Sequence, residues 1–222
     1  MHQLLSISRI TLTVRYSHYY SRYAIHRITL WLIGNLSGNY AQDVGSHDLQ
    51  LACDHFLPLT ADQIPTGQIA PVQTFPLFDF STKKRLGDVL TRVDETSAHS
   101  GLDHCFVVNG ALRADGQYEY DVQGQLQQQQ SYLRLVGTLT HPGSGRTLTV
   151  HTTQPGVQIY SGNFLSLEKE QDFPFIQHNA ICLETQHFPD SLHHPHFPTV
   201  VIPGNGAAHP YYHKSIFSFG IL

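Results

Sequence analysis

Apolar and polar residues alternate with a period of two along most of this chain. Such alternation places successive side chains on opposite faces of a β-strand. It predicts strands near residues 10–16, 47–52, 102–108, 132–139, 147–152, 156–160, 180–183 and 199–202. Turn-forming clusters such as His141-Pro142-Gly143-Ser144-Gly145 separate these segments. Many short strands divided by Gly- and Pro-containing turns predict an all-β chain, an antiparallel β-sandwich or barrel.

Two segments depart from this alternation. Residues 86–93 are the only stretch that predicts a helix, and it is short. Residues 123–130 are polar and rich in Gln, which is typical of a hairpin loop or a mobile insertion.

The most informative segment is the apolar run 180–183, which Glu184 follows directly. A loop containing Pro189 and four histidines comes next. We therefore expect a buried strand that ends at a surface, with Glu184 where the strand meets a cleft. A carboxylate in that position is either a structural hydrogen-bond acceptor or a general base.

Composition and charge narrow the functional class. The 222 residues are 41% hydrophobic and 14% charged, which is typical of one large globular domain. Four arginines precede the first acidic residue, Asp43, so that residues 34–222 carry nine basic residues against 17 acidic ones. Nucleic acids and anionic membranes favour clustered Lys and Arg, so neither is an expected partner.

The three cysteines predict a reducing compartment. Cys53, Cys105 and Cys182 lie within or beside apolar runs and have no CxxC spacing, so we interpret them as reduced core thiols. No segment has the length of apolar sequence that a membrane span or a secretory signal needs, and we expect a cytoplasmic protein. A mitochondrial transit peptide over residues 1–33, which lack acidic residues, is the alternative.

Blocks that mix acids, amides and aromatic residues suggest carbohydrate recognition. Sugar hydroxyl groups need hydrogen-bond acceptors and amide donors, while the apolar faces of a pyranose ring pack on aromatic side chains. The blocks are Pro65-Thr66-Gly67 with Phe78-Asp79-Phe80, Gly101-Leu102-Asp103-His104, residues 153–164, and residues 184–198.

In these blocks the chain resembles the aldose 1-epimerase, or galactose mutarotase, family. The matching residues occur in the family's order: Ile64-Pro65-Thr66-Gly67, Gly101-x-Asp103-His104, Gln154-Pro155-Gly156, Tyr160-x-Gly162-Asn163-Phe164, and Leu183-Glu184-Thr185-Gln186 through Phe197-Pro198. The resemblance covers residues 35–222. It implies a large antiparallel β-sandwich with a sugar cleft, and interconversion of the α and β anomers of free hexoses such as galactose and glucose.

The resemblance also implies roles for individual residues. Glu184 matches the general base, and Asp103 and Gln154 match positions that bind the sugar. Tyr160 and Asn163 match cleft structure. It implies no metal or nucleotide cofactor, a small-molecule hexose as ligand, and a monomer or weak dimer.

Each assignment has a structural alternative. Asp103 could be a turn residue that accepts backbone amides, and Gln154 could make a cross-strand amide bond. His104 is expected to be a packed partner of its neighbours rather than an acid. His187, His193, His194 and His196 do not have the helical HExxH spacing of a metal site, and we expect no metal there.

The chain departs from the family before Asn35. The family's acid histidine lies four residues before this asparagine, where the chain has Trp31, and His26 is nine residues away. Indole cannot protonate a ring oxygen. We therefore expect a divergent or truncated segment at residues 1–34, within which residues 18–34 arise from an altered splice junction or a shifted reading frame, and an incomplete sandwich at 35–222.

Three functions follow from the sequence. The leading one is an aldose 1-epimerase with Glu184 as base. The alternatives are an inactive sugar-binding or regulatory member that lacks the acid, and an epimerase of phosphorylated hexoses, which would need basic residues near the cleft.

Overall fold

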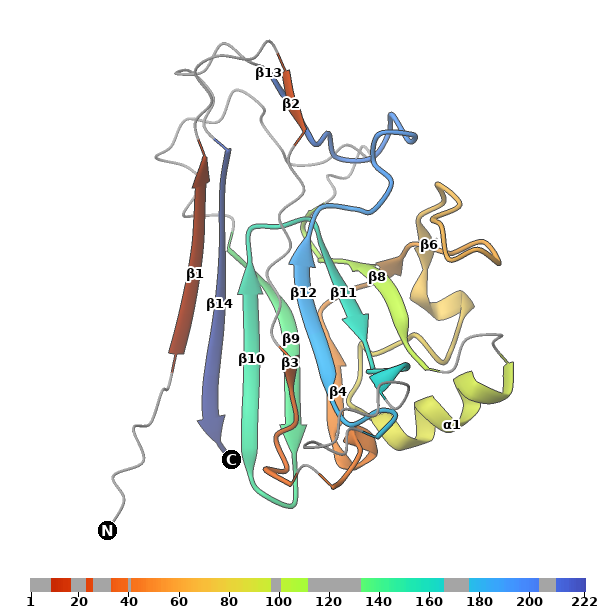
Figure 1. The fold of residues 1–222 in the computed structure, drawn as a ribbon, viewed down its shortest axis with the longest axis vertical. Coiled ribbons are helices and arrows are strands. Elements are labelled where there is room, and N and C mark those ends of the chain that lie inside the picture. Colours follow the sequence, from red (N-terminus) through yellow and green to blue (C-terminus); the bar gives the residue numbers. More distant parts are fainter. Residues whose placement is uncertain are drawn as a thin grey trace.

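The described part of the chain is a sandwich of two antiparallel sheets (Figure 1). The computed structural model describes residues 9–16, 23–25, 33–39, 41–96, 101–111, 133–165, 176–203 and 211–222. Within these residues the first sheet has the order β1 (Arg9–Tyr16), β14 (Tyr211–Ile221), β10 (Arg146–Thr152), β9 (Arg134–His141), β4 (Asp48–Leu51) and β7 (Lys84–Arg85). The second has the order β3 (Ile33–Gly34), β12 (Ile181–Gln186), β11 (Gly156–Tyr160), β8 (Asp103–Val107), β5 (His55–Phe56) and β6 (Ala70–Pro71).

Apolar side chains of both sheets meet in one core. Leu139 and Val150 come from the first sheet, and Phe106, Ile159 and Leu183 from the second, and all are at most 1% exposed. Because strand side chains alternate, the residues between them in the second sheet point to its outer face. The all-β sandwich expected from the sequence is therefore confirmed.

Short elements complete the fold. Strands β13 (Val201–Pro203) and β2 (Tyr23–Ile25) pair with each other, and two 3-10 helices span Val44–Ser46 and Val72–Thr74. The predicted helix is confirmed as α1 (Leu86–Thr96), where Leu86, Val89, Leu90 and Val93 pack into the core. No helix in the described residues is both long and apolar enough to cross a bilayer.

The predicted strands are all present: β11 matches its predicted bounds, and the others have shifted ends. One expectation about β12 is wrong. The strand does not end before Glu184 but continues to Gln186, because Glu184 and Gln186 stay in the ladder opposite Gln158 and Gly156 of β11. Strand β14 was not predicted, and neither were the strands of two or three residues other than β13. The Gln-rich segment 123–130, His26 and Trp31 lie outside the described residues.

Polar residues are buried where the chain crosses from the first sheet to the second. Ser215 Oγ lies 2.8 Å from Thr152 Oγ1 and 2.7 Å from Thr185 Oγ1. Beside them the rings of His187 and His213 meet edge to face, with centroids 5.0 Å apart. Burial lowers the pKa of His187 to about 4 and that of His213 well below its usual value. Both imidazoles are therefore neutral near pH 7.

This pair predicts that acid destabilises the fold. The unfolded chain takes up a proton at His187 near pH 6.5, whereas the folded chain does so only near pH 4. The free energy of unfolding is therefore highest above pH 6.5 and decreases as the pH falls. For His187 alone the decrease is about 2 kcal/mol at pH 5. Urea unfolding at pH 7.5, 6 and 5 measures this loss.

The variant His187→Gln should lose less of its own stability over this range than the unchanged chain does. His151→Gln, which removes a less buried imidazole from β10, is the control and should keep the original pH dependence. Parallel pH profiles for the chain and His187→Gln would contradict this prediction.

Candidate functional site

The outer face of the second sheet brings together the polar residues of three adjacent strands. The register places Glu184 of β12 opposite Gln158 of β11, and Gln158 opposite Cys105 of β8. Two residues along the strands, the same register places Cys182 of β12 opposite Tyr160 of β11, and Tyr160 opposite Asp103 of β8. With strands about 4.8 Å apart, the Cα atoms of Glu184 and Asp103 are roughly 12 Å apart, and Gln158 lies between them.

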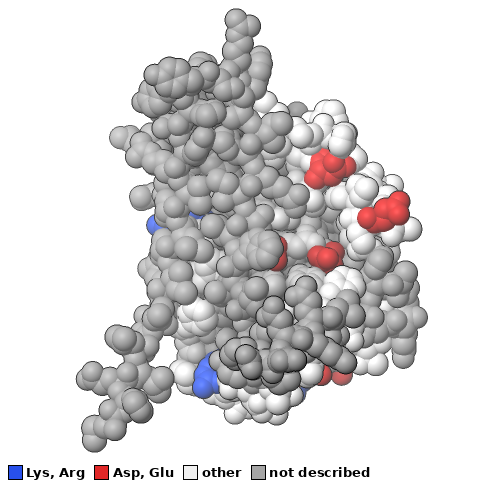
Figure 2. Space-filling view, in the orientation of Figure 1, with Lys and Arg blue, Asp and Glu red and all other residues white. Residues whose placement is uncertain are grey.

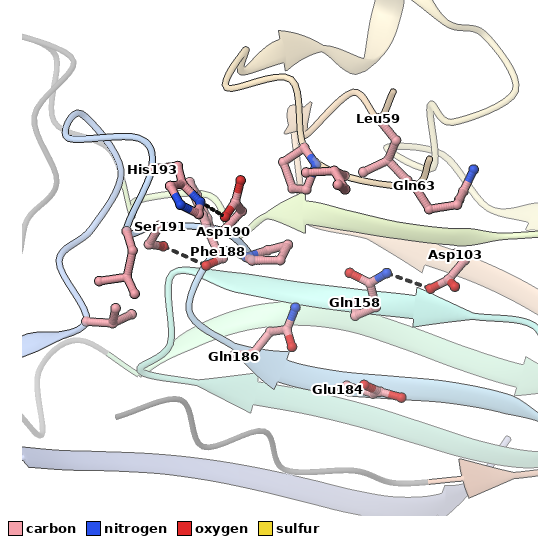
Figure 3. Close-up of a pocket in the computed structure, with 15 residues that line it drawn as sticks. Leu59, Gln63, Asp103, Gln158, Glu184, Gln186, Phe188, Asp190, Ser191 and His193 are labelled. Atoms are coloured by element: carbon pink, nitrogen blue, oxygen red, sulfur yellow. Dashed lines mark hydrogen bonds and ion pairs between the residues drawn. The ribbon is translucent and has the colours of Figure 1, made fainter. Parts of the chain in front are cut away.

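A cavity of about 610 Å³ lies over this face. Its floor contains Asp103, Gln158, Glu184 and Gln186, and its walls come from residues 59–65 and 188–193 (Figure 3). The volume is in the range of small-molecule sites. A few polar groups on rigid strands, enclosed by loops, form a typical ligand pocket.

Gln158 is hydrogen-bonded to one carboxylate of the floor, that of Asp103. Its Nε2 donates a hydrogen bond to Asp103 Oδ1 at 2.6 Å (Figure 3). Its Oε1 is buried and accepts no hydrogen bond from any described residue. Because an unsatisfied buried oxygen is costly, a ligand hydroxyl group that donates to Oε1 would be stabilised there.

The cavity is acidic. Among its described lining residues are the carboxylates of Asp103, Glu184 and Asp190 and the imidazole of His193, and none is Lys or Arg. In Figure 2 acidic side chains lie from the centre towards the right-hand and lower parts of the drawn face, whereas the visible Lys and Arg lie at its left and lower margins. Burial, followed by the charges of Glu184 and Asp103, raises the pKa of Cys182 to about 12, so this thiol remains protonated.

Tyr160, which lies opposite Asp103 in the sheet, stays neutral like Cys182. Burial raises the pKa of the Tyr160 phenol, and the charge of Asp103 contributes a smaller increase. The hydrogen bond that the phenol oxygen accepts from the Phe164 backbone amide lowers this pKa. The Tyr160 phenol and the Cys182 thiol are therefore both protonated near pH 7.

Imidazole groups hold the two walls of the cavity together. His194 Nε2 donates to the Pro65 carbonyl oxygen at 3.3 Å, and His196 Nε2 donates to that of Gly67 at 2.7 Å. Asp190 contacts His193 and lies 3.5 Å from His194 Nε2. The rim is thus fixed by hydrogen bonds between segments about 130 residues apart.

The structure brings together two of the three site residues predicted from the sequence. Glu184 and Asp103 both line the cavity. Gln154 does not line the cavity. This residue is 1% exposed in the connection between β10 and β11, where its backbone N–H donates a hydrogen bond to Thr152 Oγ1 at 3.0 Å. Its assignment to the sugar site remains a prediction.

Sequence reasoning missed Gln158, Gln186 and Asp190 as lining residues. Residues two apart on a strand share a face, so Gln186 could have been inferred from Glu184. Gln158 required the register between β11 and β12, which the sequence does not give.

The remaining assignments from the sequence are structural. His104 packs on Phe78 with ring centroids 4.4 Å apart, and burial lowers its pKa to about 4, so the expected packing role is confirmed. The three cysteines are free and buried, as expected. In the described residues no three His, Cys, Asp or Glu side chains are grouped to hold a metal ion.

Comparisons with known proteins agree with this geometry. A sequence profile of the aldose 1-epimerase family matches residues 34–212. This chain belongs to the aldose 1-epimerase family. It is 35% identical over 190 residues to galactose mutarotase from Bos taurus, and 28% identical over 165 residues to aldose 1-epimerase from Escherichia coli. These alignments cover 84% and 74% of this chain, but only 47% and 42% of the two relatives.

The family fold is also found among solved structures. An aldose epimerase homologue from C. elegans superposes with a TM-score of 0.70 at 20% identity, covering 97% of this chain and 57% of that one. Galactose 1-epimerase from Lactobacillus acidophilus gives a TM-score of 0.54 at 19% identity, covering 96% and 63%. The chain spans about half the length of the curated relatives it matches.

The cavity rim leads to a prediction at Gly67. This glycine has φ +86°, and a Cβ there would lie 2.7 Å from His194 Nδ1. Gly67→Ala should lower the free energy of unfolding by about 1–3 kcal/mol more than a substitution without this clash. Thermal unfolding measures the difference.

Gly145→Ala is the matched control. Gly145 has a similar φ of +72°, but its nearest neighbour would be Ile221 at an ordinary 3.6 Å. Equal destabilisation by the two substitutions would show that His194 does not crowd this position.

Proposed function

We propose that this chain binds a free hexose in the 610 Å³ cavity and catalyses interconversion of its anomers, as an aldose 1-epimerase. The observation that carries the proposal is the cavity floor, where Glu184 and Asp103 lie on either side of Gln158. Membership of the aldose 1-epimerase family supports the same reading.

Each floor residue has a role in this proposal. Glu184 takes the proton from the anomeric hydroxyl group, while Asp103 and Gln158 Oε1 accept hydrogen bonds from other sugar hydroxyls. The Gln158–Asp103 hydrogen bond holds both side chains in place before the sugar arrives. When the ring opens, rotation about C1–C2 and closure on the other face give the second anomer.

Ring opening also needs an acid at the ring oxygen. Among the described lining residues the only imidazole is His193, whose side chain is 78% exposed at the rim. This observation favours a second candidate function, a sugar-binding protein that does not catalyse anomer exchange. In either case we propose residues 35–222 as the sugar-binding sandwich, with no metal or nucleotide needed.

Polarimetry of freshly dissolved α-D-galactose separates the two functions. We expect the chain to accelerate mutarotation above a buffer blank, and Glu184→Gln to remove at least about 99% of this acceleration, because the amide cannot accept the proton. The substitution is nearly isosteric, so the urea midpoint should be almost unchanged.

Acceleration that survives in Glu184→Gln would contradict the assignment of the base. A folded chain that binds galactose but is no faster than buffer would support the binding protein. A folded chain that neither binds nor accelerates would overturn both functions.

The two glutamines give a separate prediction. Gln158→Leu should weaken galactose binding about tenfold, since it removes a cavity acceptor and releases Asp103. Gln154→Leu, a change of the same type outside the cavity, should leave the affinity of the folded protein within about twofold. Titration calorimetry measures the galactose affinity of both variants. A larger loss of affinity in Gln154→Leu than in Gln158→Leu would place Gln154 in the sugar site.

A further inference from the structure

The residue before Asp103 is bound at both of its backbone polar groups by the side chains of Ser161 and Asn163. The Leu102 N–H donates a hydrogen bond to Ser161 Oγ at 2.8 Å. The Leu102 carbonyl oxygen accepts from the Ser161 backbone N–H at 3.0 Å and from Asn163 Nδ2 at 3.2 Å. Ser161 Oγ also donates to Asn163 Oδ1 at 2.6 Å. We call Ser161 and Asn163 the clamp.

The clamp is buried and closely packed. Both of its residues are buried. A Cβ at Gly101 would lie 2.2 Å from Asn163 Oδ1 and 2.6 Å from Ser161 Oγ, so no other residue fits at this position without moving the clamp. His178 Nδ1 donates to the Ser161 carbonyl oxygen at 2.9 Å and so connects the clamp to the segment that leads into β12. Buried hydrogen bonds that form such a network strengthen one another.

The clamp acts on the peptide group that precedes Asp103. The Leu102 carbonyl and the Asp103 N–H belong to one planar peptide unit, which includes the Cα atom of Asp103. Two hydrogen bonds to the Leu102 oxygen therefore fix the position of this Cα atom. Asp103 is the first residue of β8, and its pairing with Tyr160 is the last pair of the ladder between β8 and β11. At this end of the ladder the clamp continues the connection between the two strands.

The position of Asp103 also determines that of Gln158. Asp103 Oδ1 accepts the 2.6 Å hydrogen bond from Gln158 Nε2 (Figure 3). Because the side-chain amide is planar, this bond also orients Gln158 Oε1. A displacement of Asp103 would therefore move two of the acceptors that we propose for the hexose. Glu184 lies one strand further away, on β12.

Closure of the turn after β11 is the simpler explanation for polar residues in this segment. That turn has hydrogen bonds of its own, from the Leu165 N–H to the Gly162 carbonyl oxygen at 3.4 Å and from the Phe164 N–H to Tyr160 Oη at 3.3 Å. The clamp side chains instead reach Leu102, about 60 residues earlier in the chain. Turn closure does not explain these contacts.

We infer that Ser161 and Asn163 are positioning residues, which hold Asp103 and, through it, Gln158 in the arrangement that binds the hexose. The ligand in this inference rests on the proposed function. The positioning of Asp103 and Gln158 does not, because it can be measured without a sugar.

Asn163→Leu tests the inference. The two side chains are of similar size, the Leu102 oxygen keeps its bond to the Ser161 N–H, and Ser161 Oγ can donate to the same oxygen, 3.4 Å away, so this variant should fold. NMR of the ¹⁵N-labelled chain without sugar detects the side-chain NH₂ of Gln158, which is identified by its absence in Gln158→Leu. We expect its protons to exchange with solvent at least about tenfold faster in Asn163→Leu.

The same variant should bind galactose about three- to tenfold more weakly, because two acceptors of the cavity floor are displaced. In polarimetry its kcat should change less than about twofold, because the proposed base, Glu184, lies on β12. A purely structural role for Asn163 would not separate affinity from kcat in this way.

Asn179→Leu is the matched control. Asn179 is 4% exposed, as Asn163 is, and lies two residues before β12, but its Nδ2 donates to the Gln42 carbonyl oxygen at 2.8 Å. Its loss should lower the free energy of unfolding by a similar amount, about 1–3 kcal/mol. Solvent exchange at Gln158 and the affinity for galactose should stay within about twofold of the unchanged chain.

Exchange at Gln158 that is unchanged in Asn163→Leu, or that becomes equally fast in both variants, would overturn the inference. Faster exchange in Asn163→Leu without a loss of galactose affinity would overturn its connection to the ligand. If the unchanged chain binds no galactose, the proposed function fails, whereas faster exchange confined to Asn163→Leu would still support the positioning of Asp103 and Gln158.

Discussion

The antiparallel ladder that joins β12, β11 and β8 is the constraint on which both the core and the site depend. It places Leu183, Ile159 and Phe106 in the core, and their neighbours Glu184, Gln158 and Cys105 on the outer face. A slip of one residue in any strand would exchange these faces. Such a slip would expose apolar side chains worth about 1.5–3 kcal/mol each and bury a carboxylate without a partner. The stability of the core therefore fixes the geometry of the cavity floor.

The strands that could be predicted from the sequence are those whose buried face is apolar. Strand β11 has Val157 and Ile159 inward, and its bounds matched. Strand β14 was missed because two of its buried residues are polar: His213 bonds to Thr153 Oγ1, and Ser215 to Thr152 and Thr185. The C-terminal end of β12 could not be predicted for the same reason, because Glu184, Thr185 and Gln186 are all polar although Thr185 faces inward. Strands of two residues, such as β7, are too short to show any period.

The candidate site could be predicted only in part, for a related reason. Glu184 and Asp103 stand in short sequence blocks that resemble those of the family, so their chemistry could be inferred from the sequence. The places of Gln154 and Gln158 depend on where the chain leaves one sheet and enters the next. Gln154 falls in that crossing and is buried, whereas Gln158 lies four residues further on, in the ladder opposite Glu184. Register and crossing point are tertiary features, so no local pattern separates these two residues.

The charge of the cavity over the second sheet bears on which ligands it can take. Three carboxylates line this cavity, and none of its described lining residues is Lys or Arg, so a phosphorylated sugar would bring a dianion towards like charges. This counts against an epimerase of phosphorylated hexoses. The neutral hexose that we propose as the ligand would meet no such repulsion, and its hydroxyl groups could donate hydrogen bonds to these carboxylates.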